Sequence, residues 1–182
     1  MERPVPHATA ILVVDVQERL AAAMPKETLD RLVANVGILV EAAKTLGVHV
    51  LASEQYPKGL GPTLSAIAEK LPSPPLAKMT FDACSDLAIA RALESLAPRT
   101  VIVAGMEAHV CVFQTARELV KRGHQTIVLA DAVSSRREEN RVLGLSLCER
   151  AGAAIAPTET VLFDLLERAG TDAFKTVSKL VR

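Results

Sequence analysis

The chain has no tryptophan and few other aromatic residues: one tyrosine and four phenylalanines, 3% of 182 residues. Platforms that stack single-stranded nucleic acid need several aromatic side chains, which this composition does not supply. Lysine plus arginine equals aspartate plus glutamate at 21 each, with no basic stripe or arginine-rich arm. These features predict no nucleic-acid partner. Zero net charge does little to oppose self-association, so a homo-oligomer remains open.

Cysteines are also scarce, and their spacing excludes two kinds of site. Three is an odd number, and the intervals between Cys84, Cys111 and Cys148 fit neither a disulfide framework nor a zinc site. Hydrophobic residues form 49% of the chain, but no run is long enough to span a bilayer. The first residues lack the layout of a signal peptide. We therefore expect a cytoplasmic protein without a membrane partner, built as one domain over residues 1–182.

Short apolar runs alternate with segments of helical period along the chain. The runs predict strands at residues 8–14, 48–52, 76–78, 100–104, 125–129 and 153–156. The helical segments are 28–46, 85–96, 109–122, 138–151, 158–169 and 171–180, with Ser85, Thr158 and Thr171 as expected N-caps. This repetition predicts an α/β fold in which helices cover both faces of a parallel sheet.

Three chemically useful side chains fall at the carboxyl ends of predicted strands, where open α/β sheets bind their ligands. Asp15 follows the first strand, Lys78 ends the third, and Cys111 follows the fourth after Gly105 and a short turn. A thiol, a carboxylate and an ammonium together supply the nucleophile, base and cation needed for acyl transfer. The pattern alone thus indicates a reactive site at this edge.

Each of these residues also has a simpler interpretation. Most free cysteines are small buried hydrophobic residues, which is our prediction for Cys84 and Cys148. Cys111 differs because it opens a predicted helix, where the helix dipole is expected to lower the thiol pKa. Asp15 could instead cap a helix, and Lys78 could be solvated at its strand end.

Three motifs resemble those of the isochorismatase-like cysteine hydrolase superfamily, which includes nicotinamidases and N-carbamoylsarcosine amidohydrolases. They are Val14-Asp15-Val16-Gln17, Lys78-Met79-Thr80-Phe81 and Gly105-Met106-Glu107-Ala108-His109-Val110-Cys111-Val112. The segment at 54–61 and the pair Phe174-Lys175 are similar to the isochorismatase domain-containing proteins and their bacterial relatives. The resemblance extends over nearly the whole chain.

The resemblance implies a three-layer α/β/α sandwich with a six-stranded parallel sheet, and a role for each site residue. Asp15 would take the proton of Cys111, while Lys78 would stabilise the thiolate and orient Asp15. A cis peptide is expected between Met106 and Glu107, with the backbone N–H groups of Glu107 and Cys111 forming an oxyanion hole. The implied reaction is hydrolysis of a small amide, carbamoyl or related carbonyl compound through a Cys111 thioester.

The chain also departs from better-known members of the superfamily. Nicotinamidases carry metal-binding histidines after the second strand, whereas residues 53–57 here contain none, so we expect neither a metal nor another cofactor. The Glu107 carboxylate could meet a cationic substrate, or it could be a carboxylate favoured by a helix start. By the same resemblance, the small-molecule pocket would be lined by Gln17, Gln55, Tyr56 and Phe81.

Two other functions remain open from the sequence. One is a scaffold that keeps the fold and a reactive thiol without turnover. The other is a redox-responsive protein, because an accessible cysteine of low pKa oxidises readily. Family members are commonly dimers or larger assemblies, which makes a homo-oligomer the expected state by analogy.

Overall fold

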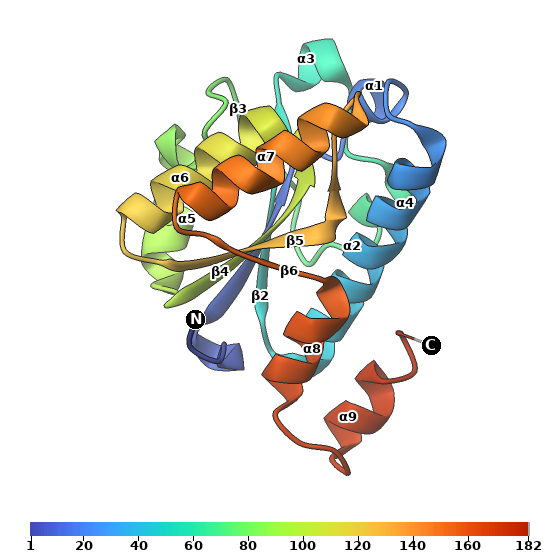
Figure 1. The fold of residues 1–182 in the computed structure, drawn as a ribbon, viewed down its shortest axis with the longest axis vertical. Coiled ribbons are helices and arrows are strands. Elements are labelled where there is room, and N and C mark those ends of the chain that lie inside the picture. The colour runs from blue at the N-terminus through green and yellow to red at the C-terminus, as the bar shows by residue number, and fades with distance from the viewer. Residues whose placement is uncertain (182) are drawn as a thin grey trace.

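The computed structural model describes residues 1–181, which form a six-stranded parallel sheet with the strand order β3-β2-β1-β4-β5-β6 (Figure 1). The predicted parallel α/β fold is confirmed. The strands are β1 (Thr9–Val14), β2 (His49–Gln55), β3 (Leu76–Lys78), β4 (Thr100–Met106), β5 (Gln125–Ser134) and β6 (Ala154–Ala156). The chain moves outward from β1 to β3, then returns to β4 on the other side of β1, which makes the β1–β4 border the switch point of the topology.

Helices cover both faces of this sheet and complete three layers (Figure 1). One face carries α5 (Leu87–Leu96), α6 (Phe113–Lys121) and α7 (Glu138–Arg150), whose buried residues share one core cluster. The other face carries α2 (Lys26–Leu46), α4 (Ser65–Ala68), α8 (Thr158–Leu166) and α9 (Asp172–Val177). Two short helices, α1 (Glu18–Ala21) and α3 (Pro57–Leu60), lie beyond the carboxyl ends of the strands. Shorter helical turns are η1 (Pro6–Ala8), η2 (Ala83–Ser85) and η3 (Ala108–Val112).

The central strand shows why the sequence forms a buried sheet. All six residues of β1 are buried, and the four from Ile11 to Val14 alternate between the two core clusters. Ile11 and Val13 pack toward α2, whereas Leu12 and Val14 pack toward α5 and α6. A continuous apolar run is therefore required, because neither face of a parallel sheet meets water.

Several boundaries differ from the predicted ones, mostly because polar residues continue the strands. β2 runs on through Ser53 to Gln55 and β5 through Asp131 to Ser134, since backbone pairing in the sheet continues past the apolar run. The predicted cap Ser85 is wrong: Asp86 caps α5 by accepting the N–H groups of Ala88 and Ile89. Thr158 is also not a cap, because its hydroxyl donates to Asp131; Thr171 does cap α9.

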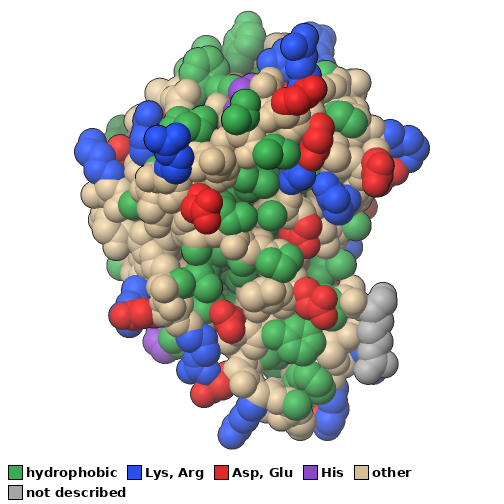
Figure 2. Space-filling model, in the orientation of Figure 1, with side chains coloured by type: hydrophobic (Ala, Val, Ile, Leu, Met, Phe, Trp, Pro, Cys, Tyr) green, Lys and Arg blue, Asp and Glu red, His purple; other side chains and the backbone are tan. Residues whose placement is uncertain are grey.

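Charged side chains of both signs are interspersed over the face shown in Figure 2, with hydrophobic side chains between them. This distribution agrees with the zero net charge of the chain. In residues 1–181, no helix is both long and apolar enough to cross a membrane.

Gly105 permits the close approach of β4 to β1 at the edge that carries the site. It pairs with Val14 across the two strands and has a φ of +127°. A Cβ atom placed on Gly105 would lie 2.0 Å from the carbonyl oxygen of Val14. Because the obstacle is backbone, no rotation of a side chain relieves the clash.

We expect Gly105→Ala to lower the free energy of unfolding by about 3 kcal/mol or more, since it adds both a clash and an unfavourable φ. Gly37→Ala is the matched control, because Gly37 lies inside α2 and its nearest new contact would be Lys70 Cε at 3.6 Å. That change should stabilise the helix by about 0.5–1 kcal/mol. Denaturant unfolding of both variants measures the difference, and equal stabilities would contradict this account of Gly105.

Candidate active site

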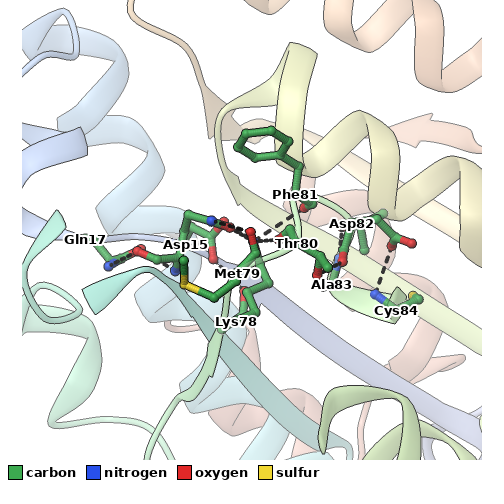
Figure 3. Close-up of polar contacts among 12 residues, drawn as sticks. Asp15, Gln17, Lys78, Met79, Thr80, Phe81, Asp82, Ala83 and Cys84 are labelled. Atoms are coloured by element: carbon green, nitrogen blue, oxygen red, sulfur yellow. Dashed lines mark hydrogen bonds and ion pairs between the residues drawn. The ribbon is translucent and has the colours of Figure 1, made fainter. Parts of the chain in front are cut away.

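Asp15 and Lys78 form a buried ion pair at the carboxyl edge of the sheet (Figure 3). Lys78 Nζ lies 2.7 Å from Asp15 Oδ2, and both side chains are 0% exposed. Although Asp15 and Lys78 are far apart in the sequence, the strand order brings them together. β2 lies between β1 and β3, and the long side chain of Lys78 reaches across β2. The structure thus rejects the two simpler interpretations, a helix-capping Asp15 and a solvated Lys78.

The Lys78 ammonium is held by further acceptors. It donates to Gln55 Oε1 at 2.7 Å and to the carbonyl oxygen of Thr80 at 3.1 Å, and the carbonyl of Phe81 lies 3.4 Å away. In Figure 3 the chain from Lys78 to Phe81 curls around the ammonium, while the Phe81 ring points away from it. A buried charge is tolerated only when it is paired and hydrogen-bonded, which these contacts achieve.

Ser53 is a site residue that the sequence analysis missed. Its hydroxyl donates to Asp15 Oδ1 at 2.7 Å, so each oxygen of the Asp15 carboxylate has its own partner. Asp15 itself has a φ of +52°, in the left-handed region that aspartate tolerates better than most residues. The available signal was the sheet register, because Ser53 pairs with Val14, the residue just before Asp15.

Cys111 lies in η3, the turn of π-helix that leads into α6, and is 6% exposed. The expected lowering of its thiol pKa is wrong. Burial raises the pKa of Cys111 to about 12, and the negative charge of Asp15 raises it further. The positive charge of Lys78 lowers this pKa. A hydrogen bond with Asp15 raises the pKa, and one with the backbone N–H of Glu107 lowers it. The resting group is therefore a protonated thiol beside a carboxylate, which favours proton transfer to Asp15 during attack.

The other two cysteines provide a comparison within the molecule. Both are buried, as predicted, and burial raises the pKa of each to about 12. For Cys148 burial is the sole cause; for Cys84 the nearby Asp82 and Arg122 act as well. What distinguishes Cys111 is thus its coupling to Asp15 and Lys78, and not the value of its pKa.

The peptide bond between Met106 and Glu107 is cis in the structure, at the position given by the family resemblance. A contact of the Glu107 backbone N–H with the Cys111 thiol lowers the pKa of that thiol. The Glu107 carboxylate, in contrast, is bound by Arg136, with Nε–Oε1 at 2.6 Å and Nη2–Oε2 at 3.3 Å. No helix-capping hydrogen bond is made by this side chain. Arg136 is a second residue that the sequence analysis did not identify.

The four predicted pocket residues divide into two pairs. Gln17 and Gln55 are buried and bonded to each other: Gln17 Nε2 donates to the Gln55 carbonyl at 3.0 Å, and the Gln55 N–H donates to Gln17 Oε1 at 2.7 Å. Gln55 also accepts a hydrogen bond from the Lys78 ammonium through Oε1 and so contacts the ion pair. Tyr56 and Phe81 are exposed; Tyr56 follows Gln55 in the chain, and Phe81 follows Thr80, whose carbonyl accepts the same ammonium.

A metal centre was not expected. Among residues 1–181, no three His, Cys, Asp or Glu side chains lie close enough together to hold a metal ion.

Comparison with known proteins identifies the family. Residues 9–160 match the model of the isochorismatase domain. The chain belongs to the isochorismatase family. Isochorismatase domain-containing protein 2 of Danio rerio is 35% identical over 175 residues, covering 95% of this chain and 86% of that protein. The similarity thus spans the whole set of site residues described above.

Two solved structures place the fold within the isochorismatase-like hydrolases. A Caenorhabditis elegans structure titled as MAR1 ribonuclease has 34% identity and a TM-score of 0.92, covering 99% of this chain and 92% of that one. The Escherichia coli YcaC product, described as an octameric hydrolase of unknown specificity, has 22% identity and a TM-score of 0.90, with 99% and 91% covered. The latter likeness concerns the fold alone. Membership of the family supports hydrolase activity in this isochorismatase-family protein.

The coupling of Cys111 to Asp15 predicts an unusual effect of Asp15→Asn. Both contributions of Asp15 to the thiol pKa disappear while Lys78 keeps its charge, so the pKa of Cys111 should fall. We expect alkylation of Cys111 by iodoacetamide at about pH 8 to become roughly tenfold faster. Mass spectrometry of the cysteine peptides measures the rate.

Cys148 serves as the internal control, because burial alone sets its pKa and its rate should stay unchanged. An unaltered or slower rate at Cys111 would show that the Asp15 charge does not act on the sulfur.

Proposed function

We propose that this chain is a cysteine hydrolase that cleaves a small amide, carbamoyl or related carbonyl compound through a Cys111 thioester. The main support is that the Cys111 thiol is coupled to both members of the buried Asp15–Lys78 pair. In this proposal Cys111 is the nucleophile, Asp15 is the general base and acid, and Lys78 stabilises the developing thiolate and orients Asp15.

The proposed chemistry needs only these groups and a water molecule. The Cys111 proton moves to Asp15 as the sulfur attacks the carbonyl carbon, giving a tetrahedral oxyanion. Collapse breaks the bond to the leaving amine, which takes the proton from Asp15 and leaves a thioester. Water then attacks the thioester with Asp15 again accepting a proton, and the departing Cys111 sulfur recovers it as the acid is released.

The oxyanion hole in this proposal consists of the backbone N–H groups of Glu107 and Cys111. Its support is the contact of the Glu107 N–H with the Cys111 thiol, since this donor then lies beside the atom that would attack a bound carbonyl. Two fixed donors in a closed site stabilise developing charge strongly; losing one such donor typically costs about 2.7–4 kcal/mol.

The substrate is proposed to be small and to enter beside Tyr56 and Phe81. These exposed side chains are the outer part of the predicted pocket, while Gln17 and Gln55 form its inner frame through their mutual bonds. No metal takes part in the proposed reaction, since the histidines that nicotinamidases use are missing from residues 53–57. Only 6% of Cys111 is accessible, which favours a compact reacting group.

The ribonuclease title of the C. elegans structure raises RNA as a different substrate. Against it stand a net charge of zero and a 3% aromatic content, because RNA binding draws on basic surfaces and stacking side chains. We therefore propose a small molecule. A redox-responsive thiol is also less favoured, because a thiol with a pKa of about 12 holds little reactive thiolate at neutral pH.

The proposal includes a homo-oligomer in the cytoplasm. The octamer named for E. coli YcaC supports the assembly, and α7 exposes Val142, Leu143 and Leu147, which a second copy could cover. Three free buried cysteines suit a reducing compartment. Sedimentation analysis should give a mass of at least two chains, and a monomer at micromolar concentration would contradict the assembly.

Cys111→Ala tests the proposed nucleophile. A panel of small amides and carbamoyl compounds, with a single-stranded RNA included, should yield at least one small compound that the wild-type protein hydrolyses. Cys111→Ala should lower that rate by at least about 10³-fold, because no other group supplies the thioester.

Cys148→Ala is the matched control and should keep the wild-type rate, since burial alone acts on the Cys148 thiol and neither Asp15 nor Lys78 does. Intact-mass spectrometry of the wild-type protein during turnover should reveal an acyl adduct on Cys111. Hydrolysis of RNA that survives Cys111→Ala, or equal small-molecule rates in both variants, would refute the proposal.

A further inference from the structure

Residues 107–109, which include the Glu107 N–H, are held by side chains of the connection between β5 and α7. The hydroxyl of Ser135 accepts the backbone N–H of Ala108 at 3.1 Å and also lies 3.1 Å from His109 Nδ1. The neighbouring Arg136 holds the Glu107 carboxylate through two hydrogen bonds. Two consecutive residues of one connection thus fix three consecutive residues of the other.

Helix α7 packs against the same residues from the side of the core. A Cβ atom on Gly144 would lie 2.6 Å from both Ala108 C and His109 N, so only glycine lets the helix approach this closely. Residues 107–109 are therefore packed against the backbone of α7 and hydrogen-bonded by the side chains of Ser135 and Arg136. Such support resists small displacements of the Glu107 N–H, to which catalysis by fixed dipoles is sensitive.

Charge gives Arg136 a second effect. Glu107 is 5% exposed, whereas the Arg136 side chain is 60% exposed, so the carboxylate of this pair is buried while the guanidinium reaches solvent. An unpaired carboxylate at this position would repel an oxyanion bound by the N–H of the same residue. Removing one partner of such a pair leaves a buried charge without compensation, which is costly.

The contacts could suggest a different function, because Ser135, His109 and Glu107 follow one another like a hydrolytic serine triad. Two observations exclude that reading. Ser135 is 1% exposed, and its hydroxyl already accepts the Ala108 N–H, so no substrate carbonyl reaches it. His109 Nε2 and Glu107 Oε2 are 3.7 Å apart, beyond hydrogen-bond distance.

We propose that Arg136 and Ser135 are positioning residues that hold the Glu107 backbone N–H against the reacting centre, with Arg136 also neutralising the Glu107 carboxylate. This inference rests on the proposed function, because it assigns supports to the oxyanion hole of that reaction. Both residues act through the groups to which they are hydrogen-bonded, Ser135 through Ala108 and Arg136 through Glu107.

Arg136→Ala tests the inference, with Arg137→Ala as the matched control. Arg137 is the next residue, is exposed, and forms no ion pair within residues 1–181, so the control removes the same charge from the same connection. For Arg136→Ala we expect kcat to fall by about ten- to a hundredfold with little change in KM. Arg137→Ala should match the wild-type protein.

The rate of iodoacetamide alkylation separates an effect of Arg136 on the site from a general loosening of the fold. This measurement does not depend on turnover. In Arg136→Ala, Cys111 should react more slowly at about pH 8, by roughly tenfold, since the Glu107 charge is unbalanced. Cys84 and Cys148 should keep their wild-type rates. A joint rise at all three cysteines, or a Cys111 rate equal to that of Arg137→Ala, would overturn the inference.

Arg136→Lys covers the case in which the alanine variant fails to fold. Lysine keeps the positive charge but not the two-pronged geometry, so kcat should fall by a smaller factor while the alkylation rate of Cys111 stays near that of the wild-type protein. A wild-type kcat in Arg136→Lys would also overturn the inference. If the wild-type protein shows no Cys111-dependent turnover, the proposed function fails, while the alkylation comparison still decides whether Arg136 acts on the site.

Discussion

The buried ion pair between Asp15 and Lys78 is the interaction on which the candidate site depends. Two charges taken out of water demand partners for every remaining hydrogen-bonding group. The chain supplies them from one strand and one turn: Ser53 and Gln55 from β2, and carbonyl groups in the turn that follows β3. Because each partner serves the pair, the polar residues at this edge form one connected network whose members cannot move independently.

The sequence predicted the elements that obey simple periodic rules. β1 and β4 are buried on both faces, so their apolar runs were unmistakable. Asp15 was found because it follows the run of β1, and Lys78 because it ends the short strand β3. Ser53 and Arg136 were not found, since their partners are 38 and 29 residues away and the contacts depend on register and on a turn. A hydroxyl within one strand and an arginine after another carry no local signal of what they bind.

The state of Cys111 was predicted incorrectly for a related reason. Its position suggested an exposed helix start, where the dipole lowers a thiol pKa. The π-helical turn instead buries the sulfur beside a carboxylate, and burial together with Asp15 outweighs Lys78 and the Glu107 N–H. Depth of burial is a property of the assembled fold, so a sequence gives the neighbours of a cysteine more readily than its ionisation. The result changes the expected resting nucleophile from a thiolate to a thiol that needs a base.

The short length of β3 affects how the Asp15–Lys78 ion pair is broken. β3 has three residues and stands at the border of the sheet, yet it carries the lysine of the ion pair. Border strands open locally far more often than central ones, so detachment of β3 withdraws the ammonium while β1 and β4 stay folded. Pro72, Pro74 and Pro75 precede this strand and restrict the conformations it can adopt when released. We therefore expect the ion pair to be lost by local opening at this edge of the sheet before the central strands unfold.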